Sequence, residues 1–315
     1  MNRISNILVI VDPTATQHPA VVKGAILAEQ LDARLELFAC DTKASREARM
    51  AAHLLQPRAP YTFNLKALLE ELAEPPRGRG IDVITQTQCA EPLHAALADR
   101  TKSTRADLVI KDTHHHSIAR RTFLTNTDWE LIRSCPAPLL LTKATTWSKR
   151  PRILAAVDPG HADDKPAYLD HEILEYAAYL VHGLNGELHA AHAYMPVAII
   201  AAATSGTPPM ATMLSADDLA AEEQSKRKEI TALAAAYATD PANVHVQVGS
   251  AVEFLPRIAT SLQIDIVTMG TISRSGLKRV FIGNTAERVL ERLPCDVLVI
   301  KPPNFAALLA VQVPQ

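Results

Sequence analysis

The 315-residue chain is long enough for two domains of ordinary size, and 48% of its residues are hydrophobic, as in a globular protein. Its net charge of −2 argues against a general nucleic-acid-binding protein, and none of its apolar runs reaches the roughly 18 residues of a membrane span. The four cysteines form no CxxC pair and the first residues leave no room for a signal peptide, so we expect a cytoplasmic protein with reduced thiols.

The first half alternates aliphatic runs with amphipathic stretches. Residues 7–11 are apolar on both faces and stop at Asp12-Pro13, which is typical of a buried parallel strand. A helical pattern follows over residues 20–31. Further strands are predicted at 35–39, 81–84, 108–110 and 139–141.

The second half repeats the alternation after a short polar segment, 142–151, which we expect to link two domains, 1–146 and 147–315. Strands are predicted at 153–157, 188–193, 244–248, 266–269 and 297–300, and helices at 170–182, 216–237, 252–262 and 285–293. Ser215 and Asp218 are placed as a capping box for the second of these helices. The alternation predicts the α/β class, with two tandem open parallel sheets of five strands and helices on both faces.

An internal repeat supports two copies of one domain. Residues 107–143 match residues 265–301 at a constant offset of 158, and 7–13 match 153–159. A repeat of this period fixes the architecture before any local pattern is considered. The recurring residues of the first copy are Asp107, Val109, Thr113, Ser117, Arg121, Phe123, Asn126, Thr127, Pro136, Leu140 and Lys143.

A candidate ligand site lies in the second copy, beyond the carboxyl ends of its first and fourth strands, where open parallel sheets bind ligands. Glycine allows a backbone to approach phosphate closely, and a helix N-terminus offers unpaired N–H groups. Asn284 is the expected N-cap of the following helix, with Glu287 three residues on. A capped helix after a glycine is also common without any ligand. The candidate residues are Asp158, Pro159, Met269, Gly270, Ser273, Gly283, Asn284 and Thr285.

These residues and the repeat resemble the universal stress protein family, in a tandem form that covers nearly the whole chain twice. Nucleotide-binding members carry Gly-x2-Gly-x9-Gly-(Ser/Thr) after the fourth strand, and the frame here reads Gly270, Ser273, Gly283 and Asn284. The resemblance implies a Rossmann-like fold and ATP, with its associated Mg²⁺, in the second domain only. It implies that Asp158 meets the adenine, that Gly270 and Ser273 line the ribose-phosphate, and that Gly283 and Asn284 meet the outer phosphates.

The first domain departs further from the family pattern. Its corresponding positions are Asp112, His115, Thr125 and Asn126, so every glycine is absent. Asp112 and Asp128 place negative charge where a polyphosphate would lie, which lowers affinity. We therefore expect a degenerate first site. Because ordinary members of the family pair through their last strand, the tandem chain is expected to form an intramolecular pseudo-dimer, and a homodimer of two such chains is left open.

Other clusters carry weaker hypotheses. Three adjacent histidines, 114–116, suggest a metal, but they cannot all face one ion and have no nearby carboxylate or cysteine, so no metal site is predicted. His189 and His192 are expected on opposite faces of one strand. Lys278-Arg279 is either a solvated pair or a phosphate contact.

Three functions follow as hypotheses. The first is a regulatory stress-response protein that binds an adenine nucleotide or a small apolar ligand and passes the signal to unknown protein partners. The second is a slow ATP hydrolase, although no Walker lysine or general base accompanies the motif and no catalytic residue is assigned. The third is a carrier for a small hydrophobic ligand, with the apolar segment 195–214 as its cover.

Overall fold

The structure is a computed structural model of residues 1–315. It describes residues 3–55, 63–88, 93–115, 122–159, 168–196, 216–273, 281–302 and 305. These residues form two compact units, and the division between them falls after Thr146. The last strand of the chain, β14 (Asp296–Ile300), belongs to unit 1 and not to unit 2.

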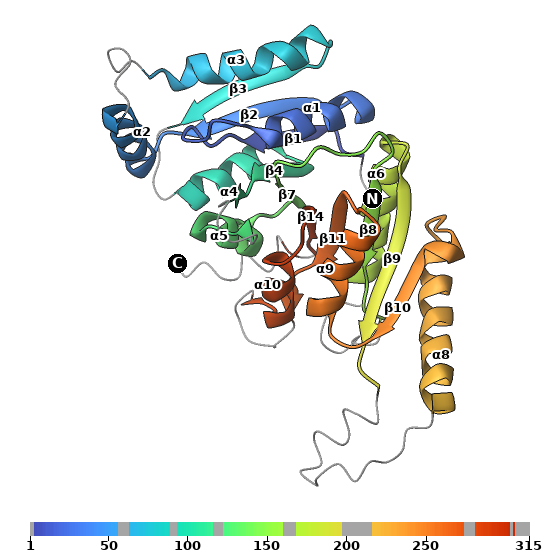
Figure 1. The fold of residues 1–315 in the computed structure, drawn as a ribbon. Coiled ribbons are helices and arrows are strands. Elements are labelled where there is room, and N and C mark those ends of the chain that lie inside the picture. The colour runs from blue at the N-terminus through green and yellow to red at the C-terminus, as the bar shows by residue number, and fades with distance from the viewer. Residues whose placement is uncertain are drawn as a thin grey trace. The chain divides into compact units, whose positions relative to one another are not determined.

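Unit 1 is built on a sheet whose strand order is β14-β7-β4-β1-β2-β3 (Figure 1). The central strands β1, β4 and β7 are almost wholly buried, which explains the run of at least three aliphatic residues in each. All neighbours pair in parallel except β14 and β7, which are antiparallel. The other strands are β1 (Asn6–Ile10), β2 (Arg34–Cys40), β3 (Val83–Gln88), β4 (Leu108–Asp112) and β7 (Leu139–Thr142).

The helices of unit 1 begin at local signals that the sequence carries. Thr125 and Asp128 form a capping box at the start of α5 (Asn126–Ser134), and Asn64 caps α3 (Leu65–Gly78). α1 (Pro19–Leu31) starts with proline and packs on β1, β2 and β4. The remaining helices are α2 (Lys43–Leu55) and α4 (Leu93–Thr104), and a short ladder joins β5 (His114–His115) to β6 (Thr122–Phe123).

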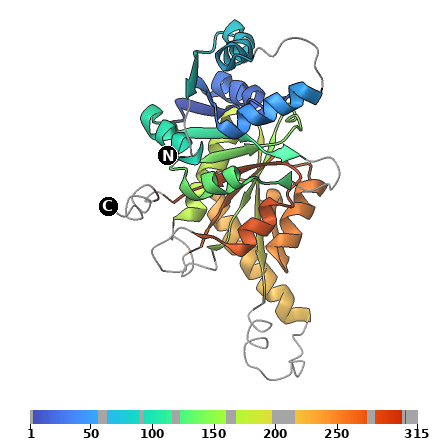
Figure 2. The same ribbon diagram turned by 90° about the vertical axis from the view of Figure 1, so that its left-hand side faces the viewer.

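Unit 2 has four long described strands, which pair in parallel in the order β10-β9-β8-β11. They are β8 (Arg152–Ala156), β9 (Glu187–Tyr194), β10 (Val244–Val248) and β11 (Ile266–Gly270). Figures 1 and 2 show α8 (Ala216–Ala235) beside β9 and β10. The other elements are α6 (Leu169–Gly183), the 3-10 helix η2 (Pro241–Asn243), α9 (Ala251–Ser261), α10 (Asn284–Leu290), β12 (Ile272–Ser273) and β13 (Phe281–Ile282).

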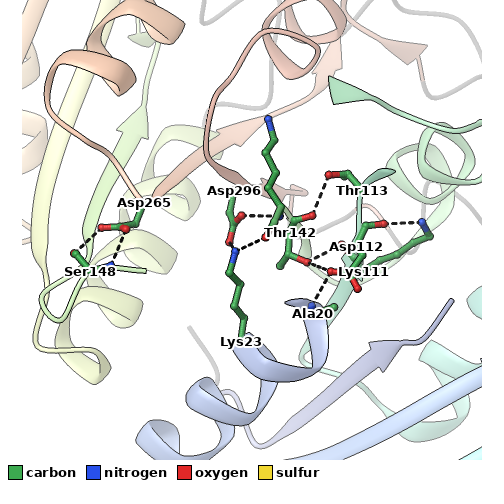
Figure 3. A network of polar contacts seen from close by, with 10 residues as sticks. Ala20, Lys23, Lys111, Asp112, Thr113, Thr142, Ser148, Asp265 and Asp296 are labelled. Carbon is green, nitrogen blue, oxygen red and sulfur yellow. Dashed lines mark hydrogen bonds and ion pairs between the residues drawn. The ribbon is translucent and has the colours of Figure 1, made fainter. Parts of the chain in front are cut away.

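The same polar anchor holds the first strand of each copy of the repeat. In unit 1, Asp107 Oδ2 accepts the N–H groups of Ser5 at 2.8 Å and Asn6 at 2.9 Å. In unit 2, its repeat counterpart Asp265 accepts the N–H groups of Ser148 and Arg152, both at 2.9 Å, and the Ser148 hydroxyl at 2.8 Å (Figure 3). The segment predicted as a linker is therefore tied to unit 2 at Ser148.

The α/β class, the mostly parallel sheet and the helices on both faces are confirmed. All ten predicted long strands are present, although β3 lies at Val83–Gln88 and not at 81–84. One strand, β14, is grouped with the other copy of the repeat. That strand pairs with β7, so the described part of unit 1 has six long strands and that of unit 2 has four.

Candidate functional site

The strand order of unit 2 reverses between β8 and β11. From β8 the chain moves outward through β9 and β10, then returns to place β11 on the other side of β8. The carboxyl ends of β8 and β11 therefore flank the point where ligands bind in open parallel sheets. Asp158 and Pro159 follow β8, and Met269 and Gly270 are the last residues of β11. The fold thus brings both predicted parts of the site to one edge.

Backbone contacts also bring Gly270 and Gly283 close together. The Gly283 N–H donates to the carbonyl of Thr271 at 3.1 Å, and β12 and β13 form an antiparallel ladder that begins beside it. A Cβ built on Gly270 would lie 2.6 Å from Cδ2 of Leu169, the first residue of α6. Glycine is therefore the residue that fits this packing without a shift of Leu169. Ser273 lies on β12, at the base of the segment 274–280, which is outside the described residues.

The helix start differs from the prediction by one residue. Gly283, and not Asn284, is the N-cap of α10, because the Gly283 carbonyl accepts the N–H of Glu287. No side chain caps this helix, so the predicted Asn284–Glu287 capping is wrong. Asn284 and Thr285 are the first two helical residues and are exposed.

Asp158 is positioned by its backbone and leaves its side chain partly open. Its N–H donates to Asp170 Oδ1 at 2.9 Å, and its side chain is 42% exposed. Its Oδ1 lies 3.7 Å from His192 Nδ1, which also lies 3.1 Å from the carbonyl of Val157. Burial lowers the pKa of His192, so the neutral ring donates Nδ1–H and keeps Nε2 as an acceptor.

Three buried polar atoms near these strand ends have no hydrogen-bond partner. They are His192 Nε2, the Tyr194 hydroxyl and the Thr271 hydroxyl. The His192 and Tyr194 rings are stacked, with centroids 6.0 Å apart. Buried polar groups usually have partners, so unpaired ones at a strand end favour a site that receives water or a ligand. His192 and Tyr194 could not be assigned to the site from the sequence, since a histidine or tyrosine inside a strand has the pattern of an ordinary core residue.

The corresponding position in unit 1 holds a carboxylate. Asp112, at the repeat position of Gly270, accepts the N–H of Ala20 and the hydroxyl of Thr142 on Oδ1, both at 2.7 Å (Figure 3). Burial raises the pKa of this carboxyl group, and its Oδ2 is buried without a hydrogen-bond partner. The Ala20 N–H, in the first turn of α1, thus has an acceptor within the chain.

The second predicted negative charge of unit 1 is paired. Asp128 is fully buried and accepts from Lys111 Nζ at 2.6 Å and from the N–H and hydroxyl of Thr125 at 2.7 and 2.8 Å. Asp128 thus holds the start of α5, and its charge is paired with that of Lys111. Thr125 is the N-cap and Asn126 the first residue of this helix, while His115 lies on β5.

His189 and His192, both on β9, have different neighbours: His245 for His189, and the Val157 carbonyl for His192. His189 Nδ1 lies 3.2 Å from His245 Nε2 of β10. Burial is the main cause that lowers the pKa of His245 to about 4, and the nearby His189 lowers it further. Among the described residues, no group of three His, Cys, Asp or Glu side chains could hold a metal ion. His116, Lys278-Arg279, the Ser215 cap and segment 197–215 lie outside the described residues.

Membrane insertion can be examined in the helices that the structure describes. None of them is both long and apolar enough to cross a membrane.

Comparison with known proteins identifies relatives along the whole chain. The profile of the Universal stress protein family matches residues 3–143 and again residues 149–301. Universal stress protein E of Escherichia coli (strain K12) is 28% identical over 312 residues, which cover 97% of this chain and 96% of that protein. The universal stress protein E homolog of Haemophilus influenzae is 26% identical over 317 residues, covering 95% of this chain and 98% of that protein.

Solved structures agree with this relationship. A functionally unknown protein from Pseudomonas aeruginosa PAO1 has a TM-score of 0.75 and 26% identity, and the match covers 98% of this chain and 97% of that one. A universal stress protein from Archaeoglobus fulgidus DSM 4304 has a TM-score of 0.62 at 16% identity, covering 95% and 99% of the two chains, which supports the fold alone. The resemblance inferred from the repeat and the glycine motif is confirmed.

Proposed function

Because the chain belongs to the universal stress protein family and carries two of its domains in tandem, we propose that this stress-response protein acts in the cytoplasm by binding an adenine nucleotide in unit 2. Binding would favour one surface state over another and so change which protein partner the chain engages. The protein would act as a ligand-dependent regulator and not as an enzyme.

The observation that carries this proposal is the junction of Gly270, Gly283 and Asp158. The bond from Gly283 N–H to the Thr271 carbonyl joins the two glycine segments where the strand order of unit 2 reverses. Backbone without side chains can approach a phosphate, and the partly exposed Asp158 carboxylate can accept hydrogen bonds from a base or ribose. The unpaired Thr271 hydroxyl offers a donor for a phosphate oxygen.

The residues of unit 2 fit a nucleotide better than those of unit 1. In unit 1 the Asp112 carboxylate occupies the strand end where unit 2 has Gly270, and it already accepts the N–H of Ala20 at the start of α1. A phosphate brought to this position would meet a carboxyl group in place of the glycine backbone. One nucleotide per chain is therefore the proposed stoichiometry, with Mg²⁺ accompanying its phosphates.

The experiment is native mass spectrometry of the freshly purified full chain, followed by addition of ATP with Mg²⁺. We expect one adenine nucleotide per chain, and its loss in the Gly270→Asp/Gly283→Asp double variant, which places carboxylates at the glycine junction. Gly78→Asp is the matched control, because a Cβ at Gly78 meets nothing within 4 Å and the residue ends α3 in unit 1. The control should retain the nucleotide.

Other outcomes point to other functions. No binding at millimolar ATP would refute the nucleotide proposal, and binding that survives the double substitution would place the nucleotide elsewhere. Phosphate release above that of the double variant would favour a slow ATP hydrolase. A lipid or other apolar molecule released from the purified protein would favour a carrier.

A further inference from the structure

The antiparallel pairing of β7 with β14 has a register that is symmetric with respect to the repeat. Leu140 pairs with Leu298, its own repeat counterpart, while Leu141 pairs with Val297 and Leu139 with Val299. A β7 strand from a second copy of the chain could therefore take the place of β14 in the same register. Leu140 would then lie opposite Leu140 of that copy, with leucine on both sides of the pair.

Backbone hydrogen bonding and apolar contact do not separate these two pairings. β7 and β14 are both almost wholly buried and both consist of aliphatic residues at the paired positions. The register of paired strands is normally set by their hydrophobic pattern. Here that pattern is the same for β14 of the same chain and for β7 of a second copy. Covalent linkage favours β14 of the same chain, and any further discrimination must come from a residue that differs between the two strands.

That residue is Asp296, at the start of β14. Its side chain is fully buried and accepts from Lys23 Nζ of α1 at 2.6 Å and from the Lys143 N–H at 2.8 Å (Figure 3). Lys23 Nζ, 4% exposed, also donates to the Lys143 carbonyl at 2.8 Å. The carboxylate thus joins α1, the residue after β7 and β14 within unit 1.

The repeat places Pro138 at the position of Asp296. If β7 of a second copy replaced β14, a proline would stand where the carboxylate now lies. Lys23 would lose its bond to Asp296, and so would the Lys143 N–H. Loss of one partner from a buried ion pair is strongly unfavourable, because the remaining charge stays in a medium that solvates it poorly.

We infer that the Lys23–Asp296 ion pair makes β7 select β14 of its own chain and reject β7 of a second copy. Each chain of a β7–β7 pair would lack Asp296 as the partner of its Lys23, so the unfavourable free energy would arise twice per dimer. From the usual cost of breaking a buried ion pair by removal of one partner, each defect weakens the wrong pairing about 100-fold or more. This inference does not depend on the proposed nucleotide site, which lies in unit 2.

The test uses Leu140→Cys as a reporter in the full chain. In a β7–β7 pair the two introduced thiols would face each other and form an interchain disulfide, whereas in the native pairing the introduced thiol faces Leu298. The chain is unfolded and refolded at several concentrations with oxidised glutathione, and peptide mass spectrometry identifies the disulfide that joins position 140 of two chains. The reporter is compared in the natural background and with Lys23→Met/Asp296→Asn, in which Asn still has an oxygen for the Lys143 N–H.

We expect no detectable interchain disulfide at position 140 in the natural background and at least about a tenfold increase in the neutral double variant. That variant can remain folded, since uncharged residues often replace a buried ion pair without loss of stability. The exchanged pair Lys23→Asp/Asp296→Lys restores opposite charges and should suppress the disulfide again. Equal amounts of the disulfide in the natural and neutral backgrounds would overturn the inference.

Two controls keep this comparison interpretable. Leu140→Cys/Leu298→Cys must form an intrachain disulfide, which establishes that the geometry of the paired strands permits the bond. Circular dichroism monitors folding of every variant, so that a change in cross-linking is assigned to strand choice only in chains that fold.

Discussion

A single repeat position carries opposite chemistry in the two units. At the end of the fourth strand, unit 1 has Asp112, which satisfies the start of α1, and unit 2 has Gly270, which leaves backbone without a side chain. This repeat position therefore holds a carboxylate that binds the start of α1 in unit 1, and a glycine packed against Leu169 in unit 2. Neither spacing nor the apolar pattern reveals that Asp112 has this role, because it depends on Ala20 and Thr142, which are remote in sequence.

Replacement of Asp112 tests its structural role. Asp112→Ala removes the acceptor for the Ala20 N–H and the Thr142 hydroxyl, and should lower the free energy of unfolding by about 1–2 kcal/mol. Asp112→Asn keeps one oxygen in place and should lose less than half as much. Urea unfolding of both variants at pH 7 measures the difference, and equal losses would show that the acceptor is unimportant.

Lys301 is a buried cation whose titration should be visible in stability. It is 6% exposed, donates to the Ile132 carbonyl and lies 4.8 Å from the centroid of the Phe305 ring, and burial lowers its pKa to about 8. Between the folded pKa and the normal value of 10.5 the unfolded chain binds more protons, so this group makes the protein more stable as pH rises.

The prediction is a difference in pH dependence. From pH 7 to pH 10 the natural protein should gain about 1–3 kcal/mol of unfolding free energy relative to Lys301→Met. Urea unfolding at both pH values measures the gain. Lys66→Met, at an exposed position of α3, is the control and should follow the natural protein. If Lys301→Met showed the same pH slope as the control, the titration assigned to Lys301 would be wrong.

At the scale of elements, carboxylates before the fourth strands fix where the first strands begin. Asp107 holds the amides of Ser5 and Asn6, and Asp265 holds those of Ser148 and Arg152. Each substitution to alanine should lower the unfolding free energy by about 1–3 kcal/mol, since hydrogen bonds to a charged acceptor are lost. The two losses should add, because the sites share no partner.

Chemical denaturation of the two single variants and the double variant at one pH measures these losses. Asp99→Ala, at an exposed position of α4, is the matched control and should change stability little. A double variant that loses much less than the sum would mean that the two anchors are coupled and would contradict their independence.

The sequence predicts the positions of buried strands more accurately than the position of an exposed edge strand. The aliphatic runs of β1, β4, β7 and β8 lie in the core, so their positions were close to those found. The prediction starts β3 too early, because only Val83 and Ile84 of this edge strand are apolar and the rest alternates threonine with glutamine. The N-cap of α10 was misplaced because asparagine is a good cap, whereas here the backbone of Gly283 serves instead.

At the scale of the whole molecule, the two units do not coincide with the two copies of the repeat. The repeat divides the chain in two, but β14 completes unit 1. Periodicity could not show this, since it identifies a strand without naming its neighbour. The ion pair that fixes β14 was equally hidden, because Lys23 and Asp296 are 273 residues apart and charged residues usually lie on the surface.

A fragment of residues 1–146 should therefore not reproduce unit 1. It lacks β14 and exposes the buried edge of β7, so we expect lower stability and concentration-dependent association, measured by urea unfolding and sedimentation velocity. Lys23→Met in this fragment should strengthen the association, because it removes the cation that Asp296 no longer balances. A monomeric fragment with the stability of the full chain would contradict this prediction.

The Lys23–Asp296 ion pair also shows how fusion of two similar domains into one chain allows equivalent positions to acquire different residues. In a dimer of identical subunits every substitution occurs on both sides of the symmetry axis, so Pro138 and its counterpart could not differ. Once both copies lie in one chain, each position can vary alone. The aspartate at one of two equivalent positions, with its lysine on one helix, is a difference that covalent linkage permits and that separate identical subunits could not maintain.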